Sequence, residues 1–314
     1  MKFVLFNNGK PGLLKDDYVV DISNVIENKT GQEAMAYIIT NLDKIRMDLV
    51  RFADQQQGLP ITDITIQPPL PKPGKILCMG GNFTEFGHRA PGPMWGFLKS
   101  SDSVIGPDGT VILPTDDANI FHHEAELVLV FNRYGKDVAE HSALDYVFGY
   151  TCGVDVSARM PANPNNPPTE FQAWRGVATH KSHKTFAPLG PSIVTKDEIS
   201  DPQNLQVRLS VDGELRGDFN TSDMAHSIAK SIAFVSQYES FDVGDVLYTG
   251  TNHQGLGAMQ NGETLRIDIE EVGGFSFSVS DPLNRKWNKG IDEETAEDVR
   301  EGKGAPGRRK RPIS

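Results

Sequence analysis

Two glutamates in one strand-like run are the residues of this chain best placed to do chemistry. The run Phe-His-His-Glu-Ala-Glu-Leu-Val-Leu-Val-Phe spans residues 121–131 and contains Glu124 and Glu126. Residues i and i+2 of a strand share a face and lie roughly 6.5 to 7 Å apart, so both carboxylates can converge on one point. Two adjacent anions need compensation, which either a Lys or Arg side chain or a bound cation can give.

A third carboxylate, Asp155, stands in an apolar strand-like run at 149–159. Three oxygen ligands with room for water suit Mg²⁺ or Mn²⁺, and Ca²⁺ is compatible with them. Zinc would more often recruit imidazoles, which His122 and His123 offer. Spacing alone favours the other interpretation, carboxylates paired with basic residues, because such pairs occur at many sites without function.

The composition indicates a globular protein that handles small molecules. The chain has 314 residues, of which 38% are apolar, and a formal charge of −11, which repels nucleic acid and anionic lipid. Its first apolar run is too short for a signal peptide, and no apolar stretch reaches the roughly 18 residues of a membrane span. Cys78 and Cys152 lie in apolar runs, which suits buried thiols in a reducing compartment. We therefore expect a cytoplasmic protein with neither nucleic acid nor membrane as a partner.

Three regions follow from the patterning along the chain. Residues 1–70 predict a small N-terminal domain. We expect strands at Lys2 to Asn7 and Tyr18 to Ile22, followed by a helix around 31–56. A linker at 67–74 carries four prolines and a glycine, so it marks a boundary before a main domain at 71–282. Residues 283–314 are charged and lose apolar periodicity, which predicts a mobile tail.

The main domain is predicted to consist mostly of short strands. Apolar and polar residues alternate before Asp212-Gly213, and a second strand-like run returns after it. This pattern predicts a two-residue hairpin. A helix is expected after a cap at Thr221 or Ser222, with Met224 and later apolar residues on its buried face. The other expected strands are Lys75 to Met79, Val111 to Leu113, Glu124 to Phe131, Tyr150 to Val156 and Val246 to Thr249.

Several short motifs, in a fixed order between about residues 68 and 281, resemble the fumarylacetoacetate hydrolase family. They are the segments at 68–83, 97–100, 122–127, 153–159 and 181–191, Asn-Thr at 220–221 and Tyr-Thr-Gly-Thr at 248–251. The resemblance implies an α+β, mainly β fold, a mixed β-sandwich or β-roll with a small N-terminal α/β domain. It also implies a homodimer, a Mg²⁺ or Mn²⁺ held by Glu124, Glu126 and Asp155, and a small substrate with a 2-keto acid or β-diketone unit.

The resemblance extends to residues around the metal. Lys181 matches a lysine of the family that could stabilise an oxyanion, and Thr251 matches a threonine that binds the substrate carboxylate. Arg159 either pairs with a carboxylate of the site or braces the core. His253 offers an imidazole at the substrate end, although a loop histidine is more often a surface residue.

The chain departs from the family where a catalytic base is expected. Many members carry Asn-Tyr-Ala-Asp-His, but here Phe86 occupies the histidine position. His88 lies two residues later and could reach the site from a lid, and Glu85 stands at the position of the acid. Met160 and Ala162 replace an Asp and a Gln that often follow the third carboxylate.

Two enzyme functions and one rival follow. The first is metal-dependent hydrolysis of a carbon–carbon bond in a 2,4-diketo acid, an acylpyruvate or a fumarylacetoacetate-like compound. The second is a decarboxylase, tautomerase or hydratase acting on a chelating keto acid, which the departures at 86 and 162 favour. A non-catalytic relative is the third, and the three retained carboxylates speak against it.

Overall fold

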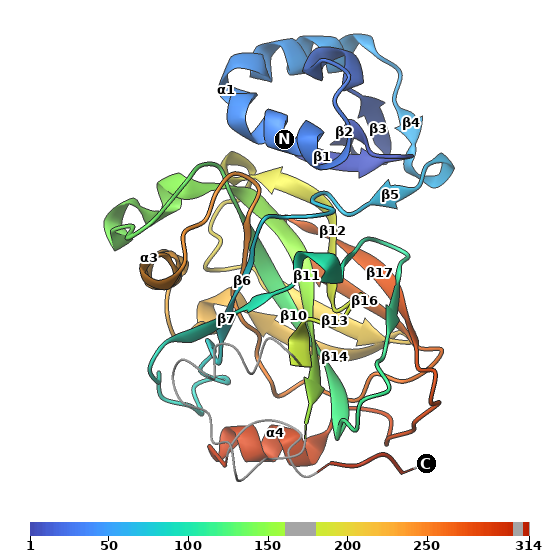
Figure 1. The fold of residues 1–314 in the computed structure, drawn as a ribbon, viewed down its shortest axis with the longest axis vertical. Helices are drawn as coiled ribbons and strands as arrows, with labels where there is room; N and C mark the ends of the chain where they lie inside the picture. The colour runs from blue at the N-terminus through green and yellow to red at the C-terminus, as the bar shows by residue number, and fades with distance from the viewer. Residues whose placement is uncertain (161–179, 304–309, 314) are drawn as a thin grey trace.

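The structure is a computed structural model that describes residues 1–160, 180–303 and 310–313. Two sheets dominate this part of the chain, one of twelve strands and one of five, and few helices accompany them. This agrees with the predicted α+β, mainly β class. Figure 1 shows the N-terminal module at one end of the long axis and the C-terminal helix at the other.

The N-terminal module is an extension of the large sheet. Strand β1 pairs antiparallel with β12 of the main body, with Lys2 opposite Val194 and Phe3 opposite Ile193. Helix α1 (Gly31–Gln55) packs its apolar face in a core shared with the main body, in which Ile38 joins Val128 and Val130. The module's strands are β1 (Lys2–Phe6), β2 (Lys10–Lys15), β3 (Tyr18–Asp21), β4 (Leu59–Pro60) and β5 (Ile66–Gln67).

The centre of the large sheet is the antiparallel pair β10 (Ile120–Phe131) and β11 (Val147–Arg159). Every residue of β10 is buried, because sheet neighbours flank it and both faces are covered. The remaining strands of this sheet are β6 (Ile76–Gly80), β7 (Trp95–Lys99), β8 (Val104–Ile105), β12 (Ala187–Thr195) and β15 (Val246–Tyr248). The centre of the sheet is therefore a rigid support for any side chain that β10 carries.

The five-stranded sheet packs on this centre, so that residues such as Leu127 and Val207 share one core. Its β13–β14 hairpin confirms the predicted turn, since Asp212 and Gly213 both have positive φ, 50° and 83°. The strands are β9 (Thr110–Ile112), β13 (Gln206–Val211), β14 (Glu214–Asn220), β16 (Thr264–Ile269) and β17 (Gly273–Ser280).

The predicted helix after Thr221 or Ser222 begins later than expected. Residues Thr221–Asp223 form only a 3₁₀ turn, which the Asn220 side chain caps by accepting from the Ser222 N–H. Met224 has φ of −59° and ψ of 132°, outside the helical region, so the helical path is broken there. Helix α3 (Ile228–Tyr238) starts after Ser227, whose hydroxyl accepts from the Lys230 N–H at 3.1 Å.

A helix absent from the predictions, α4 (Glu293–Arg300), lies in the charged C-terminal region. Asp292 caps it by accepting from the Thr295 N–H, and Ala296 and Val299 are buried. This part of the predicted tail is thus a packed element. Other 3₁₀ turns are Ser23–Ile26, Ile61–Asp63, Ser101–Ser103, Glu140–Tyr146 and Lys196–Glu198.

Both cysteines, Cys78 and Cys152, are buried free thiols, as predicted. Among the described residues, no helix has the length and apolarity needed to cross a membrane.

Candidate active site

Strand alternation brings the three predicted carboxylates together. Glu124 and Glu126 project from one face of β10, and Asp155 lies directly opposite Glu124 on β11. One oxygen of each carboxylate lies within 4.8 Å of the other two, and none of the three residues is more than 3% exposed. This is the geometry expected of an oxygen-ligand cation site.

Basic side chains also contact this cluster. The carboxylates therefore show both expected features, the geometry of a cation site and ion pairs with Lys and Arg. Lys181 Nζ lies 2.5 Å from Glu124 Oε2 and 2.5 Å from Asp155 Oδ2. Lys99, on β7, lies 2.5 Å from Asp155 Oδ1, and Arg159 pairs with Glu124. Lys99 was not assigned a role from the sequence, although it lies in the Phe-Leu-Lys-Ser motif.

The three carboxylates differ in charge compensation. Burial alone would raise the pKa of Glu124, but Lys181 and Arg159 outweigh it and hold that pKa well below its usual value. Burial, reinforced by Asp155 and Glu124, raises the pKa of Glu126 well above normal. Glu126 has no ion-pair partner among the described residues and accepts a hydrogen bond from the Gly250 N–H at 2.5 Å. A divalent cation would supply the positive charge that Glu126 lacks, so the donor set fits Mg²⁺ or Mn²⁺.

Lys181, although buried, keeps its positive charge because two carboxylates lie beside it. Burial would lower the pKa of Lys181, yet Asp155 and Glu124 more than offset it and raise that pKa. The site therefore carries a permanent ammonium next to its carboxylates.

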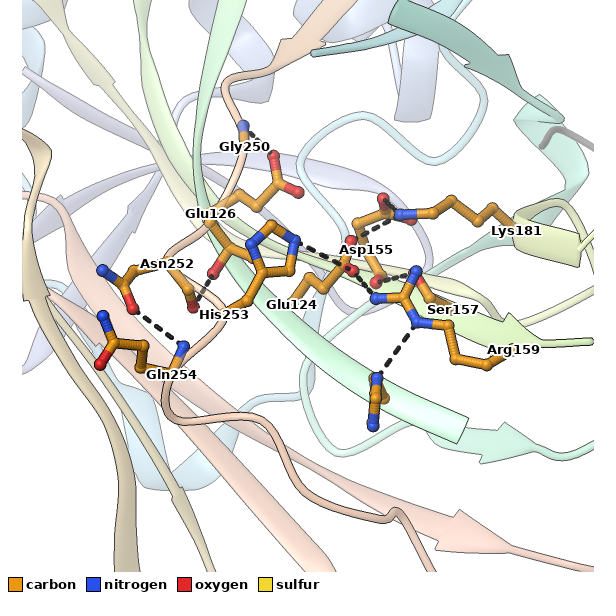
Figure 2. A network of polar contacts seen from close by, with 12 residues as sticks. Glu124, Glu126, Asp155, Ser157, Arg159, Lys181, Gly250, Asn252, His253 and Gln254 are labelled. Carbon is orange, nitrogen blue, oxygen red and sulfur yellow. Dashed lines mark hydrogen bonds and ion pairs between the residues drawn. The ribbon is translucent and has the colours of Figure 1, made fainter. Parts of the chain in front are cut away.

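A second polar arrangement, between Glu85 and His253, is clear only in the structure. Nδ1 of His253 lies 2.6 Å from Glu85 Oε1, and the His253 backbone N–H donates to Glu85 Oε2 at 2.8 Å. Nε2 on the far side of the ring lies 3.9 Å from Glu124 Oε1. Figure 2 shows the His253 ring beside Glu124, with Arg159 and Lys181 on the other side. The buried Glu85 carboxylate thus fixes the ring with one nitrogen facing the cluster.

His88, the predicted base, is not brought to the carboxylates. It is exposed and ends a turn that begins at Glu85, where Glu85, Phe86 and Gly87 all have positive φ. The turn directs Glu85 inward and leaves Phe86 and His88 outside. His253, predicted as a substrate-end residue, occupies the position suited to a base.

The neighbouring histidines, His122 and His123, are buried on the same strand. Arg159 Nε donates to His122 Nδ1 at 3.1 Å, and burial followed by Arg159 lowers the pKa of His122. Burial and Arg216 lower the pKa of His123 to about 4. Both rings are therefore neutral near pH 7. Arg159 contacts both His122 in the core and Glu124 in the site, so it has both of its predicted roles, bracing the core and pairing with a site carboxylate.

A cavity of about 370 Å³ opens beside these groups. Its walls come from several strands, from loops beside them and from the C-terminal region, where Val299 of α4 and Gly302 contribute. Thr251, which is buried and was predicted to bind substrate, also lines the cavity. Ala162 lies outside the described residues. The other lining residues are Met79, Gly80, Gly81, Arg89, Trp95, Glu124, Glu126, Arg159, Lys181, Gly250 and His253.

Helix α4 is also connected to the loop that carries His253. Arg300 Nη1 donates to Gln254 Oε1 at 3.3 Å, and Gln254 Nε2 donates to the Glu85 carbonyl at 2.6 Å. The backbone N–H of Asp292, the helix cap, donates to the Leu256 carbonyl at 2.8 Å. The C-terminal region therefore supports the Glu85–His253 pair.

A family model described as fumarylacetoacetate (FAA) hydrolase C-terminal matches residues 75–280, which include all three carboxylates and His253. The chain belongs to the fumarylacetoacetate hydrolase family. It is 34% identical over 235 residues to a Xenopus laevis protein named oxaloacetate tautomerase fahd2, mitochondrial, covering 71% of each chain.

Two solved structures extend the comparison. The maleylpyruvate hydrolase from Sphingobium sp. SYK-6, in complex with manganese (II) ion and pyruvate, is 27% identical with a TM-score of 0.78, over 90% of this chain and 99% of that one. The 5-carboxymethyl-2-hydroxymuconate delta-isomerase from Mycobacterium smegmatis is 34% identical with a TM-score of 0.62, over 72% and 84%. The manganese in a structural relative and the buried carboxylate cluster here agree with the predicted Mg²⁺ or Mn²⁺ cofactor. The family supports an enzyme acting on acylpyruvate-type substrates, and its members include hydrolases, isomerases and tautomerases.

Proposed function

We propose that this family member is a divalent-metal-dependent hydrolase that cleaves a carbon–carbon bond in a 2,4-diketo acid of the acylpyruvate type. The supporting observation is the Glu85–His253 pair, whose free Nε2 faces the carboxylate cluster and the cavity. Hydrolysis needs a base that activates water beside the substrate, and a histidine oriented by a buried carboxylate is suited to that task.

The residues of the chain account for the proton movements. His253 Nε2 takes a proton from water, and the oxygen of that water attacks the acyl carbonyl carbon, C4. The C3–C4 bond breaks, its electron pair goes to C3 as the enolate of pyruvate, and His253 returns the proton to C3. The products are pyruvate and a carboxylic acid, so water supplies the only added atoms.

Other groups hold the substrate and its developing charge. Glu124, Glu126 and Asp155 would hold Mg²⁺ or Mn²⁺, which as a Lewis acid polarises the keto and carboxylate oxygens of the substrate. Lys181 keeps its ammonium close to the same point and stabilises negative charge there. Thr251 lines the cavity, and in this proposal it binds the substrate carboxylate.

A tautomerase acting on a 2-keto acid is the second candidate, supported by the similarity to a protein named oxaloacetate tautomerase. The same pair favours it as well, since His253 alone could move a proton between C3 and the keto oxygen without activating water.

The test follows acylpyruvates with purified protein and Mn²⁺, by the ultraviolet absorbance of their enol form and by mass analysis of products. Metal-dependent release of pyruvate and a free acid is the expected result. Enol–keto conversion without pyruvate would replace the hydrolase with the tautomerase. A protein that binds Mn²⁺ yet changes no keto acid would overturn both.

A further inference from the structure

The turn that carries Glu85 is held by one carboxylate, that of Asp223. The Thr84 hydroxyl donates to Asp223 Oδ1, and the Phe86 N–H lies 3.1 Å from both Oδ1 and Oδ2. The Thr84 N–H also donates to the Asp223 carbonyl at 2.9 Å. Both sequence neighbours of Glu85 are therefore fixed to the same residue.

The turn needs such support because of its backbone conformation. Glu85 and Phe86 have φ of 57° and 59°, in the left-handed region that residues other than glycine rarely adopt. Two such residues in succession persist only where contacts from outside the turn hold them. The bonds from Asp223 supply these contacts, so they keep the Glu85 carboxylate pointing inward.

The same carboxylate also contacts the loop that carries His253. Asn252 Nδ2 donates to Asp223 Oδ2 at 2.9 Å, and Asn252 Oδ1 accepts from the Gln254 N–H at 3.0 Å. Figure 2 shows Asn252 joined to Gln254 beside the His253 ring. Asp223 therefore connects the residues that flank Glu85 with the residue that precedes His253.

A carboxylate is the group that this position requires. Among the described residues, Asp223 has no ion-pair partner, and its side chain accepts from a hydroxyl, a backbone N–H and an amide NH₂. Two acceptor oxygens are needed to bind these donors together. Asp223 is not among the described residues that line the cavity, so it acts through its neighbours rather than on the substrate.

We propose that Asp223 is a positioning residue for the Glu85–His253 pair. One oxygen holds the turn and the other holds the loop, at the spacing that puts Glu85 Oε1 2.6 Å from His253 Nδ1. The inference rests on the proposed function where it concerns catalysis, because His253 is the base there. The geometry of the pair can be measured without any reaction.

The test is Asp223→Asn, which keeps the shape of the side chain and replaces one oxygen by an NH₂ donor. Because the Phe86 N–H lies 3.1 Å from both oxygens, the new NH₂ faces that donor in either orientation. Nitrogen NMR of His253 in the Mg²⁺-loaded protein, recorded well above the ordinary imidazole pKa of about 6.5, should show the proton on Nδ1 in the wild type. The variant should show a mixture of tautomers. In acylpyruvate cleavage, kcat should fall roughly ten- to a hundredfold, as for a misplaced catalytic group, while KM stays within about twofold.

Two controls separate positioning from general stability. Combining Asp223→Asn with Asn252→Asp exchanges the amide and the carboxylate, so donor and acceptor meet again, and part of the lost activity and of the Nδ1 tautomer should return. Ser227→Ala removes the cap of α3, which follows Asp223 closely in sequence, and should change neither the tautomer nor kcat.

An Asp223→Asn protein that keeps the wild-type tautomer overturns the inference, whether or not any acylpyruvate is cleaved. Equal losses in Ser227→Ala, or no recovery in the exchanged double variant, would also overturn it, because Asp223 would then only stabilise the fold. A tautomer that shifts in Asp223→Asn and returns in the double variant supports the inference even if the wild type cleaves no acylpyruvate. In that case only the proposed function fails.

Discussion

Replacing Glu85 by Gln tests how the base is oriented. The His253 backbone N–H needs an acceptor, which Glu85 Oε2 provides at 2.8 Å. In Glu85→Gln the amide oxygen would keep that bond, so the amide NH₂ would face Nδ1, where Glu85 Oε1 now lies at 2.6 Å. Nδ1 would then have to accept, and the ring proton would move to Nε2. The imidazole would present a donor where the reaction needs an acceptor.

The size of the effect follows from the loss of general base catalysis, which contributes roughly 10² to 10⁴ in rate. We expect kcat for acylpyruvate cleavage to fall by about that factor, or roughly 3 to 5 kcal/mol of barrier. The variant keeps the shape of the side chain, so KM and Mn²⁺ binding should change little. His253→Asn should lose as much activity, and the double variant little more, because the two residues act as one unit.

The assay is the stopped-flow loss of enol absorbance with pyruvate quantified, together with nitrogen NMR of the histidine tautomer. His88→Asn is the matched control, since His88 belongs to the same turn but is exposed. A Glu85→Gln enzyme within about threefold of wild type would refute the orientation argument. A large loss in His88→Asn would restore that residue as the base.

Three further predictions concern the metal, the pH dependence and a helix cap. Glu126→Gln removes a buried carboxylate whose pKa is raised, so the metal-free variant should melt no lower than the metal-free wild type. The rise in Tm that Mn²⁺ causes in the wild type should vanish in the variant, because a metal ligand is lost. A preserved rise would contradict the assignment of Glu126 as a ligand. Burial and Asp201 raise the pKa of Tyr150 to about 12, so it stays neutral in the folded state and its contribution is lost as pH rises above the unfolded pKa near 10. Relative to wild type, Tyr150→Phe should gain about 1.4 kcal/mol of unfolding free energy between pH 8 and pH 11 in urea titrations, and parallel pH profiles would disprove this. Ser227→Ala should cost about 1 kcal/mol at the start of α3, whereas Ser227→Asp should keep most of the stability, and equal urea midpoints for both would show that the cap is unimportant.

The convergence of the two glutamates was predictable because it depends on local alternation, whereas the metal was expected only from the resemblance to the family. Glu124 and Glu126 fall on one face in any strand that contains them, and the apolar pattern at 149–159 placed Asp155 in a second strand-like run. The structure adds the register that sets Asp155 opposite Glu124. The homodimer, the cytoplasmic location and the exclusion of nucleic acid remain predictions.

The contact between Glu85 and His253 was not predictable, because the two residues lie 168 positions apart in sequence. Each had been noted singly, Glu85 as an acid in the motif and His253 as a loop imidazole. Only the positive φ values of the turn at 85–87 direct Glu85 inward and the later residues outward. Helix α4 escaped notice for another reason, since the apolar side chains that it buries, Ala296 and Val299, are few in a charged segment.

Helix α4 lies beyond residue 280, where the match to the common family domain ends, yet Val299 and Gly302 form part of the cavity wall. The three carboxylates, Glu85 and His253 all lie within the matched domain, so the polar centre of the cavity and this part of its wall come from separate stretches of the sequence. Substitutions in the C-terminal stretch could alter which acyl groups fit while the reactive centre stays under its own selection. This division makes α4 a natural target for directed evolution, because its side chains can change the shape of the cavity while the three carboxylates stay as they are.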